Sequence, residues 1–168
     1  FEPGLVGGHC IGVDPYYLIH KAKELGSNLE LMKTARKIND HVVDYLVEKL
    51  LFMLADNNIN LSQAKIGIMG FTFKENCPDI RNTKVIDLIH RLWEKGLELV
   101  VEDSWADYKE VEKIHGVKLK KINKKDEIDC LIVAVGHEEY RNLTPIELKE
   151  KYSRKDPLII DVKSIYDK

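Results

Sequence analysis

The sequence predicts an α/β protein in which a doubly wound parallel sheet follows a long helix. Apolar residues recur at helical spacing from about residue 29 to residue 56, which indicates one helix of unusual length. After residue 61, short apolar runs alternate with helical patterns. Such alternation is typical of a parallel sheet covered by helices on both faces.

The chain opens with a glycine-rich loop, and two helices follow it. Asp14 and Pro15 favour a helix start with Asp14 as the N-cap, and Gly26 favours its end. Ser27 or Asn28 is then expected to cap the long helix. Four glycines surround Cys10, as expected where a backbone stays close to a ligand: Gly4, Gly7, Gly8 and Gly12.

The long helix carries two apolar stripes. The first comprises Leu29, Met32, Ala35, Ile38, Val42, Leu46, Leu50 and Met53. The second comprises Val43, Val47, Leu51 and Leu54. A helix with two stripes is covered on both sides, and one stripe can face the core of this chain. We expect the other to be covered by a dimer mate or by an N-terminal portion of a longer chain.

Four strands and three helices are expected in the second half of the chain. The strands are expected at residues 65–70, 97–103, 129–135 and 157–162, and the helices at about 83–95, 106–115 and 144–151. The apolar run at 129–135 is typical of a strand buried on both faces. Ligands of such sheets bind beyond the carboxyl ends of the strands. The expected binding positions are therefore residues 71–81, Asp103, 136–137 and 161–163.

Composition and charge narrow the classes of function. The chain is 44% hydrophobic and 32% charged, as in a globular protein, and its net charge of −2 offers no basic field for nucleic acid. No apolar run approaches the roughly 20 residues of a membrane helix. Three cysteines are too few for a disulfide framework or a zinc site, which favours a reducing cytoplasm, and Cys77 and Cys130 are expected to be structural. The opening FEPGLVGGHC lacks an initiator Met and signal-peptide features, so we expect a piece of a longer chain.

Cys10 is the leading candidate for chemistry. It precedes a helix N-terminus, which favours the nucleophilic thiolate, and its flanking glycines let a substrate approach the sulfur. The alternative is a buried cysteine that behaves as a small hydrophobe. His9 is expected to point away from Cys10, as neighbouring side chains usually do, and to pack locally or touch a cofactor. Asp14 can act as an N-cap and can also hold a water or accept a proton near Cys10.

The second candidate region is the long loop GFTFKENCPDIR after the first strand. Its glycine spacing is not a dinucleotide fingerprint. Lys74 and Arg81 place two cations where a phosphate or carboxylate would bind, and Lys163 could reach the same cleft from the last strand. Alternatively, the two loop cations are a solvated pair, with Asp79 bound to Arg81. Asp103 is expected to be a turn or cap residue rather than a ribose ligand.

Two segments, PGLVGGHCIGVDPYYL and GFTFKENCPDIRNTKV, resemble the UDP-glucose/GDP-mannose dehydrogenase family. They are most similar to the subgroup that oxidises UDP-N-acetyl-hexosamines such as UDP-N-acetylglucosamine, -mannosamine or -galactosamine. The resemblance covers essentially the whole chain. It implies a Rossmann-like, UDP-sugar-binding domain at 61–168, preceded at 1–60 by an active-site loop and central helices that form a homodimer. The NAD-binding domain, with the family's catalytic Lys and Asn, would lie upstream.

The resemblance also implies a reaction: a four-electron oxidation at the sugar C6, consuming two NAD, for surface polysaccharides such as capsule or O-antigen. Cys10 would attack the aldehyde formed by the first oxidation, and the thiohemiacetal would be oxidised to a thioester that water hydrolyses. Asp14 would match a carboxylate that assists water or proton transfer, and Arg81 a residue that reaches NAD. Substrate contacts would match Gly4, Leu5, Val6, Gly7, Phe73, Lys74 and Lys163.

Two departures from the pattern bear on the substrate. UDP-glucose dehydrogenases have a Lys where this chain has Val13, and an Arg, with its bidentate fork, where it has Lys163. Both argue against plain UDP-glucose. Two other functions stay open: a stand-alone nucleotide-sugar-binding and dimerisation module without catalysis, and a cysteine hydrolase. On any of these hypotheses we expect the segment alone to have no dehydrogenase turnover.

Overall fold

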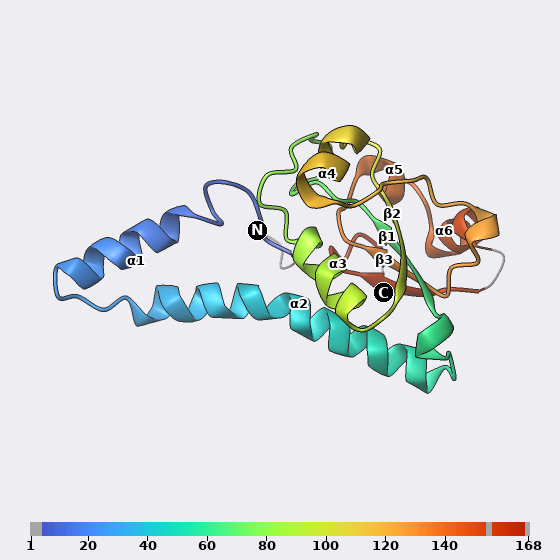
Figure 1. Cartoon of the computed structure of the whole chain (residues 1–168), viewed down its shortest axis with the longest axis horizontal. Helices are drawn as coiled ribbons and strands as arrows, with labels where there is room; N and C mark the ends of the chain where they lie inside the picture. The colour runs from blue at the N-terminus through green and yellow to red at the C-terminus, as the bar shows by residue number, and fades with distance from the viewer. Residues whose placement is uncertain (1–4, 154–155, 167–168) are drawn as a thin grey trace.

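The chain from residue 65 onward forms a parallel sheet between helices, and α1 with the first part of α2 projects from it as a helical hairpin (Figure 1). The computed structural model describes residues 5–153 and 156–166. Its strands are β1 (Lys65–Met69), β2 (Glu98–Glu102), β3 (Cys130–Val133) and β4 (Leu158–Asp161). The α/β class and the parallel sheet predicted from the sequence are confirmed.

The sheet has the order β2-β1-β3-β4, and every neighbouring pair is parallel. Ile68 of β1 pairs with Val101 on one side and Ile132 on the other. The chain runs from β1 outward to β2 and later returns to the other side of β1 for β3. The order therefore reverses between β1 and β3, where ligands of open α/β sheets usually bind.

The helices of the described residues are α1 (Asp14–Glu24), α2 (Glu30–Asp56), α3 (Val85–Glu94), α4 (Tyr108–His115), α5 (Glu138–Arg141) and α6 (Pro145–Tyr152), with 3-10 turns at Leu61–Gln63 and Lys124–Asp126. The expected helix at 83–95 begins at Val85 instead, because the Thr83 hydroxyl accepts a hydrogen bond from the Val85 N–H at 3.2 Å. The sequence did not predict α5, since four residues are too short to show helical periodicity.

Alternate side chains of the strands divide the core between the two faces of the sheet. On one face, Ile66 and Ile68 join a cluster with Leu50 of α2 and Leu88 of α3, all fully buried. On the other face, Met69 joins a smaller cluster with side chains of α5 and α6. The face covered by α2 and α3 carries the larger core, so the second half of α2 belongs to the packing of the sheet.

The two helix starts near the N-terminus differ from those expected. The helix begins at Asp14 itself, and its N-cap position is Val13, without a side-chain cap. The N-cap of α2 is Leu29. Ser27 and Asn28 both precede this position: the Ser27 N–H donates to Ala22 O at 2.8 Å in the C-terminal turn of α1, and the Asn28 side chain binds the Glu30 and Lys33 side chains. Gly26, at φ +75°, ends α1 as predicted.

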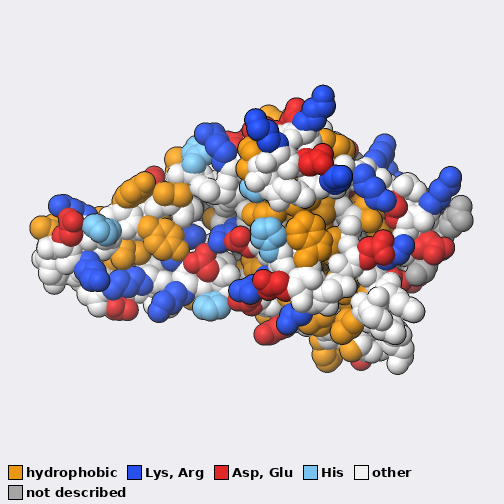
Figure 2. Space-filling view, viewed as in Figure 1, with side chains coloured by type: hydrophobic (Ala, Val, Ile, Leu, Met, Phe, Trp, Pro, Cys, Tyr) orange, Lys and Arg blue, Asp and Glu red, His pale blue; other side chains and the backbone are white. Residues whose placement is uncertain are grey.

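The apolar residues of α2 do not form two opposite stripes. Its buried apolar residues come from both expected stripes and share one face: Val43, Leu46, Val47, Leu50 and Leu54. A separate row stays exposed by 60–85% at intervals of seven residues: Leu31, Ile38, Tyr45 and Phe52. Apolar side chains also lie open on the projecting hairpin in Figure 2. Among the described residues no helix is long and apolar enough to cross a membrane.

Candidate functional site

The glycine-rich loop packs directly on the loop that follows β1. The Gly8 N–H donates to Asn82 O at 3.2 Å, and a Cβ on Gly7 would lie 2.3 Å from that oxygen. Gly8 has φ +86°, and a Cβ there would meet the Phe73 ring at 2.9 Å. Glycine is therefore required at both positions by the contact between the loops. Gly4 lies outside the described residues.

Side chains of α2 hold the same loop from the other side. Asn39 Nδ2 donates to Val6 O at 3.3 Å, and Arg36 Nη1 donates to Ile11 O at 3.5 Å. Leu5 is buried in the core, and with 4% of the whole residue exposed, neither its side chain nor its backbone is open to a ligand in this structure. The loop is thus fixed by the sheet domain and by the hairpin together.

The Cys10 thiol is exposed, and its Sγ lies 3.3 Å from His9 Nδ1. The expectation that His9 points away from Cys10 is therefore wrong. The backbone turns tightly at this point, since Cys10 O accepts hydrogen bonds from the Val13 and Asp14 N–H groups at 3.0 and 2.8 Å. In this turn the two neighbouring side chains lie on the same side of the loop.

The loop after β1 supplies the next charges. Asp79 Oδ2 lies 3.7 Å from His9 Nε2. Arg81 binds the same carboxylate through Nε, at 2.9 and 3.1 Å, and through Nη2, at 2.6 Å, which confirms the predicted Asp79–Arg81 pair. The hydrogen bonds from Arg81 hold the pKa of Asp79 at about 2, so this carboxylate is ionised at neutral pH. Phe73 meets His9 edge-on, with ring centroids 6.0 Å apart.

Cys10 and Asp14 share an open, largely apolar groove. The groove runs between the glycine-rich loop, the start of α1 and α2, and it is also lined by Ile11, Pro15, Leu18 and Met32. The structure therefore brings together the two residues predicted to be catalytic. The thiol faces this groove rather than packed hydrocarbon, so the alternative of a buried structural cysteine is excluded for Cys10.

The two predicted lysines lie at the same edge of the sheet but on different strands. Lys74 is exposed on the loop after β1. Lys163 is half-buried just after β4, where its N–H donates to Asp161 Oδ1 at 3.1 Å. Because β3 lies between β1 and β4, the two cations approach a ligand from different directions.

A buried pair, Asp103 and His137, closes the edge between β1 and β3. His137 Nε2 donates to Asp103 Oδ2 at 3.0 Å, and both side chains are fully buried. Asp103 also accepts the N–H groups of Phe71, Thr72, Trp105 and Ala106. Burial alone would raise the pKa of Asp103, but these hydrogen bonds outweigh it and hold the pKa well below its ordinary value.

The predicted role of Asp103 as a turn residue is confirmed, because its oxygens cap two successive loops. The sequence placed His137 among the expected binding positions, at 136–137 beyond the third strand, but did not predict its bond to Asp103. The close approach of Gly70 to β3, where a Cβ would lie 2.4 Å from Val135 Cβ, seals the same edge. A ligand must therefore bind outside this edge, toward the glycine-rich loop.

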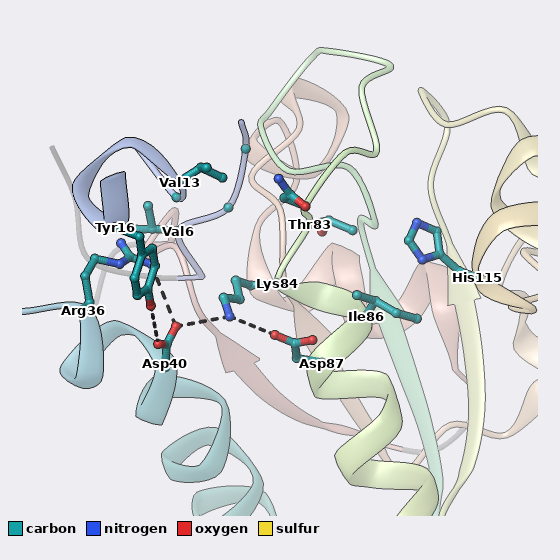
Figure 3. Close-up of a pocket in the computed structure, with 14 residues that line it drawn as sticks. Val6, Val13, Tyr16, Arg36, Asp40, Thr83, Lys84, Ile86, Asp87 and His115 are labelled. Atoms are coloured by element: carbon teal, nitrogen blue, oxygen red, sulfur yellow. Dashed lines mark hydrogen bonds and ion pairs between the residues drawn. The ribbon is translucent and has the colours of Figure 1, made fainter. Parts of the chain in front are cut away.

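A second, polar cavity of about 430 Å³ lies behind the glycine-rich loop (Figure 3). Asp40 of α2 faces three partners there: the Tyr16 hydroxyl at 3.0 Å, Lys84 Nζ at 3.2 Å and Arg36 Nη2 at 3.8 Å. Lys84 also contacts Asp87 at 2.9 Å. Burial would lower the pKa of Lys84, but its bonds to Asp87 and Asp40 outweigh it and raise that pKa. These charges join the hairpin to α3, and Arg36 Nε is a buried polar atom of the described residues without a hydrogen-bond partner.

The match to known families agrees with this arrangement. Residues 67–168 match the UDP binding domain of the UDP-glucose/GDP-mannose dehydrogenase family, and residues 1–41 match the central domain of the same family. The chain belongs to this family. The glycine-rich loop and α1 lie in the range that matches the central domain. The sheet, apart from the first two residues of β1, lies in the range that matches the UDP binding domain.

Individual family members cover almost all of the chain. A UDP-N-acetyl-D-glucosamine 6-dehydrogenase of Salmonella typhi is 43% identical over 85% of this chain, and Protein CapL of Staphylococcus aureus is 42% identical over 98% of it. The crystal structure of an NDP-N-acetyl-D-galactosaminuronic acid dehydrogenase from Methanosarcina mazei has the same fold, with a TM-score of 0.83, 23% identity and 99% of this chain covered. The chain spans 34% and 38% of the two sequence relatives and 36% of the crystallised protein.

Proposed function

We propose that this chain is the C-terminal part of an NAD-dependent UDP-N-acetyl-hexosamine 6-dehydrogenase of cytoplasmic surface-polysaccharide biosynthesis. The observation that carries the proposal is the exposed Cys10 thiol, which shares a groove with Asp14 on a loop fixed to a UDP-binding domain. The substrate class is supported by the 43% identical relative, named for UDP-N-acetyl-D-glucosamine.

The exposed thiol suits the second half of a four-electron oxidation. An aldehyde is a poor hydride donor, but addition of Cys10 Sγ to its carbon gives a thiohemiacetal that can be oxidised to a thioester. Water then cleaves the thioester, which releases the carboxylate and restores the thiol. Asp14 lines the same groove as Cys10, and we assign it the proton of the attacking water. NAD, when bound, supplies the hydride acceptor for both oxidations.

The substrate and the cofactor would meet in front of the two docked loops. The half-buried Val6 and Gly7 and the exposed Lys74 are suited to the sugar diphosphate, with Phe73 beside the loop and Lys163 at the far strand, whereas Leu5 supports the loop from the core. Arg81 is exposed and keeps Nη1 outside its three hydrogen bonds to Asp79, so it fits an edge contact with an anionic cofactor. The rest of the cofactor site would belong to an upstream domain.

The test is turnover of the full-length protein on a panel of UDP-sugars. UDP-N-acetyl-hexosamines should give uronate and two NADH per sugar, and Cys10→Ala should abolish uronate formation. Cys77→Ala, which removes a half-buried thiol elsewhere on the adjoining loop, is the matched control and should retain turnover. Uronate formation at the normal rate by Cys10→Ala would refute the thioester route.

Binding of the nucleotide can be measured on the 168-residue chain itself. Titration with UDP should give saturable binding, which Lys74→Ala weakens, because the diphosphate loses a cation. Retained binding without turnover by the full-length protein would instead support the stand-alone binding module. No binding at millimolar UDP would mean that the site needs residues outside this chain.

We also propose a homodimer formed through α2. The exposed row Leu31, Ile38, Tyr45 and Phe52 lies along one side of the helix for roughly 30 Å, and a second copy of α2 would cover it. Equilibrium sedimentation should show a dimer that Tyr45→Glu dissociates, whereas Ile146→Glu, at a side chain 69% exposed on α6, should leave it intact. A wild-type monomer, both for the chain and for the full-length protein, would contradict the dimer.

A further inference from the structure

Cys10, His9 and Asp79 are arranged as a nucleophile, its base and the group that orients the base. Sγ of Cys10 lies 3.3 Å from His9 Nδ1, and the opposite ring nitrogen, Nε2, lies 3.7 Å from Asp79 Oδ2. A nucleophile in reach of a base, with a third group holding that base, is the pattern of an activated thiol. We propose that His9 takes the thiol proton of Cys10 and that Asp79 positions His9 for this transfer.

The inference rests on the proposed dehydrogenase function and adds a residue to it. The roles assigned above use Cys10 and Asp14, and neither accounts for the contact of His9 with the sulfur. Because His9 and Cys10 come from the glycine-rich loop and Asp79 from the loop after β1, the triplet forms only when these two loops are docked.

The imidazole of His9 is held on three sides. Gly8 precedes it at φ +86° and lies against the Phe73 ring, and the same ring meets the imidazole edge-on. Asp79 Oδ2 lies 3.7 Å from the far nitrogen. The His9 side chain is about half exposed, at 48%, so the base can exchange protons with water between turnovers.

The carboxylate that faces His9 is itself immobilised. Arg81 makes three side-chain hydrogen bonds to Asp79, and the Arg81 N–H donates to Asp79 Oδ1 at 3.0 Å. The Asp79 carbonyl accepts the Phe73 N–H at 3.1 Å, which fixes the backbone as well. Arg81 cancels part of the Asp79 charge, so the carboxylate acts mainly by orienting the ring.

The charges around His9 favour one tautomer. An ionised carboxylate beside Nε2 favours the proton on that nitrogen, which leaves the Nδ1 lone pair facing the thiol. Among the described residues, the titratable and charged groups in contact with His9 are Cys10 from its own loop and Asp79 from the loop after β1, and Arg81 binds Asp79. After the transfer, the imidazolium lies between a thiolate and a carboxylate, and both anions stabilise it.

The proton transfers balance over the second half of the reaction. As the Sγ–C6 bond forms, Nδ1 takes the thiol proton, the carbonyl π pair moves to oxygen, and that oxygen takes a proton from the imidazolium. C6 then loses a hydride, which NAD would accept when bound, the hydroxyl proton passes to solvent, and the thioester results. In hydrolysis Asp14 takes a proton from the attacking water, as assigned above, and the departing sulfur takes that proton back as the S–C bond breaks. His9 ends unchanged.

The first oxidation, from alcohol to aldehyde, does not involve the thiol. A residue that acts only as the base for Cys10 should therefore affect the second oxidation alone, whereas a structural residue should affect both. In the full-length protein, His9→Gln should form the first NADH within about twofold of the normal rate. Its uronate formation should fall about 100-fold, the usual contribution of a general base. The arrested aldehyde can be trapped as an oxime with hydroxylamine, and higher pH should restore part of the uronate rate.

Asp79→Asn should reduce uronate formation about tenfold with the same point of arrest, since the ring keeps its base but loses its orientation. His20→Gln is the control, because His20 is 74% exposed on α1, and it should behave as the unmodified protein. Two NADH per sugar at the normal rate from His9→Gln would overturn the proposal. Equal loss of both oxidations would also overturn it, because His9 would then only shape the site.

A second measurement does not depend on dehydrogenase activity. Iodoacetamide reacts with thiolates, and mass spectrometry of peptides follows Cys10 and Cys77 separately in the 168-residue chain. At pH 7, His9→Gln should slow alkylation of Cys10 about tenfold and change Cys77 less than twofold. If His9→Gln slows the alkylation of Cys10 but the full-length protein makes no uronate, the dehydrogenase proposal is refuted and the His9–Cys10 pair is supported. Normal alkylation of Cys10 in the variant would refute the pair alone.

Discussion

The sheet domain and the helical hairpin differ in how much of themselves they bury. Both faces of the sheet are covered, and Leu50, Leu88 and Tyr140 are fully buried around it. The hairpin contrasts with this, because none of the residues of α1, all of them described, is buried. The sheet domain thus contains its own core, whereas the hairpin presents apolar side chains that other surfaces must cover.

The candidate chemistry lies where these two regions meet. Cys10, His9 and Asp14 belong to the loop and helix start on the hairpin side, and Asp79 belongs to the sheet domain. A reactive thiol must be accessible, so it cannot lie inside a sealed core. The sheet domain therefore holds its side of the site rigid, and the hairpin side keeps the Cys10 thiol accessible.

The first way to test this contrast is to truncate two neighbours on α2. Leu50→Ala should lower the free energy of unfolding by about 3 to 4 kcal/mol, because a fully buried side chain leaves a cavity between α2 and the sheet. Phe52→Ala, at a side chain 70% exposed, should change it by less than about 0.5 kcal/mol. Urea denaturation of the monomer measures both, and equal effects would remove the contrast.

The second test removes the charge of the buried Asp103. Asp103→Asn should cost about 2 to 3 kcal/mol in the free energy of unfolding, since an amide nitrogen cannot accept the hydrogen bonds that one carboxylate oxygen receives. Asp156→Asn, on an exposed side chain paired with Lys149, is the control and should cost under about 0.5 kcal/mol.

Acid unfolding gives the same residue a pH signature. The folded-state pKa of Asp103 is depressed, so its contribution is complete above an unfolded-state pKa of about 3.9 and is lost as the pH falls toward the folded value. Asp103→Asn should therefore lose less stability than the unmodified chain between neutral pH and strongly acidic pH. An unchanged acid slope would show that other carboxylates dominate.

The third test compares a capped with an uncapped helix start. The Thr144 hydroxyl of α6 accepts the Glu147 N–H at 3.2 Å, and the Glu147 carboxylate accepts the Thr144 N–H at 2.8 Å. Thr144→Ala should cost about 1 kcal/mol in the free energy of unfolding. Ser27→Ala, next to the uncapped start of α2, should cost under about 0.5 kcal/mol. Thermal unfolding followed by circular dichroism distinguishes the two.

The smallest effect is expected on α1. Leu18 is 53% exposed in the groove that holds Cys10, so Leu18→Ser should change the free energy of unfolding by less than about 0.5 kcal/mol. A loss above about 1 kcal/mol in the isolated chain would mean that the hairpin packs on itself more than its exposure indicates.

Patterns along the chain predicted the strands, most helices and the positions of Cys10, Asp14 and Asp79. Strand patterns and the glycines that end helices are local properties, and the structure confirms the predictions made from them. The predicted caps of α1 and α2 were wrong, because the first helix begins at Asp14 itself and the second has Leu29 as its N-cap residue. The direction of His9 was also wrong, since it depends on the turn at Cys10 and on Asp79 from a distant loop.

By itself the sequence determined the α/β class, the family and the glycine-rich motif around Cys10, because each resides in residue type and short-range spacing. Only the tertiary structure decided that Asp103 and His137 close the sheet edge, that Asp40 joins α2 to Lys84, and that His9 lies between Cys10 and Asp79. These contacts join residues far apart along the chain, and their geometry arises only when the loops and helices pack together.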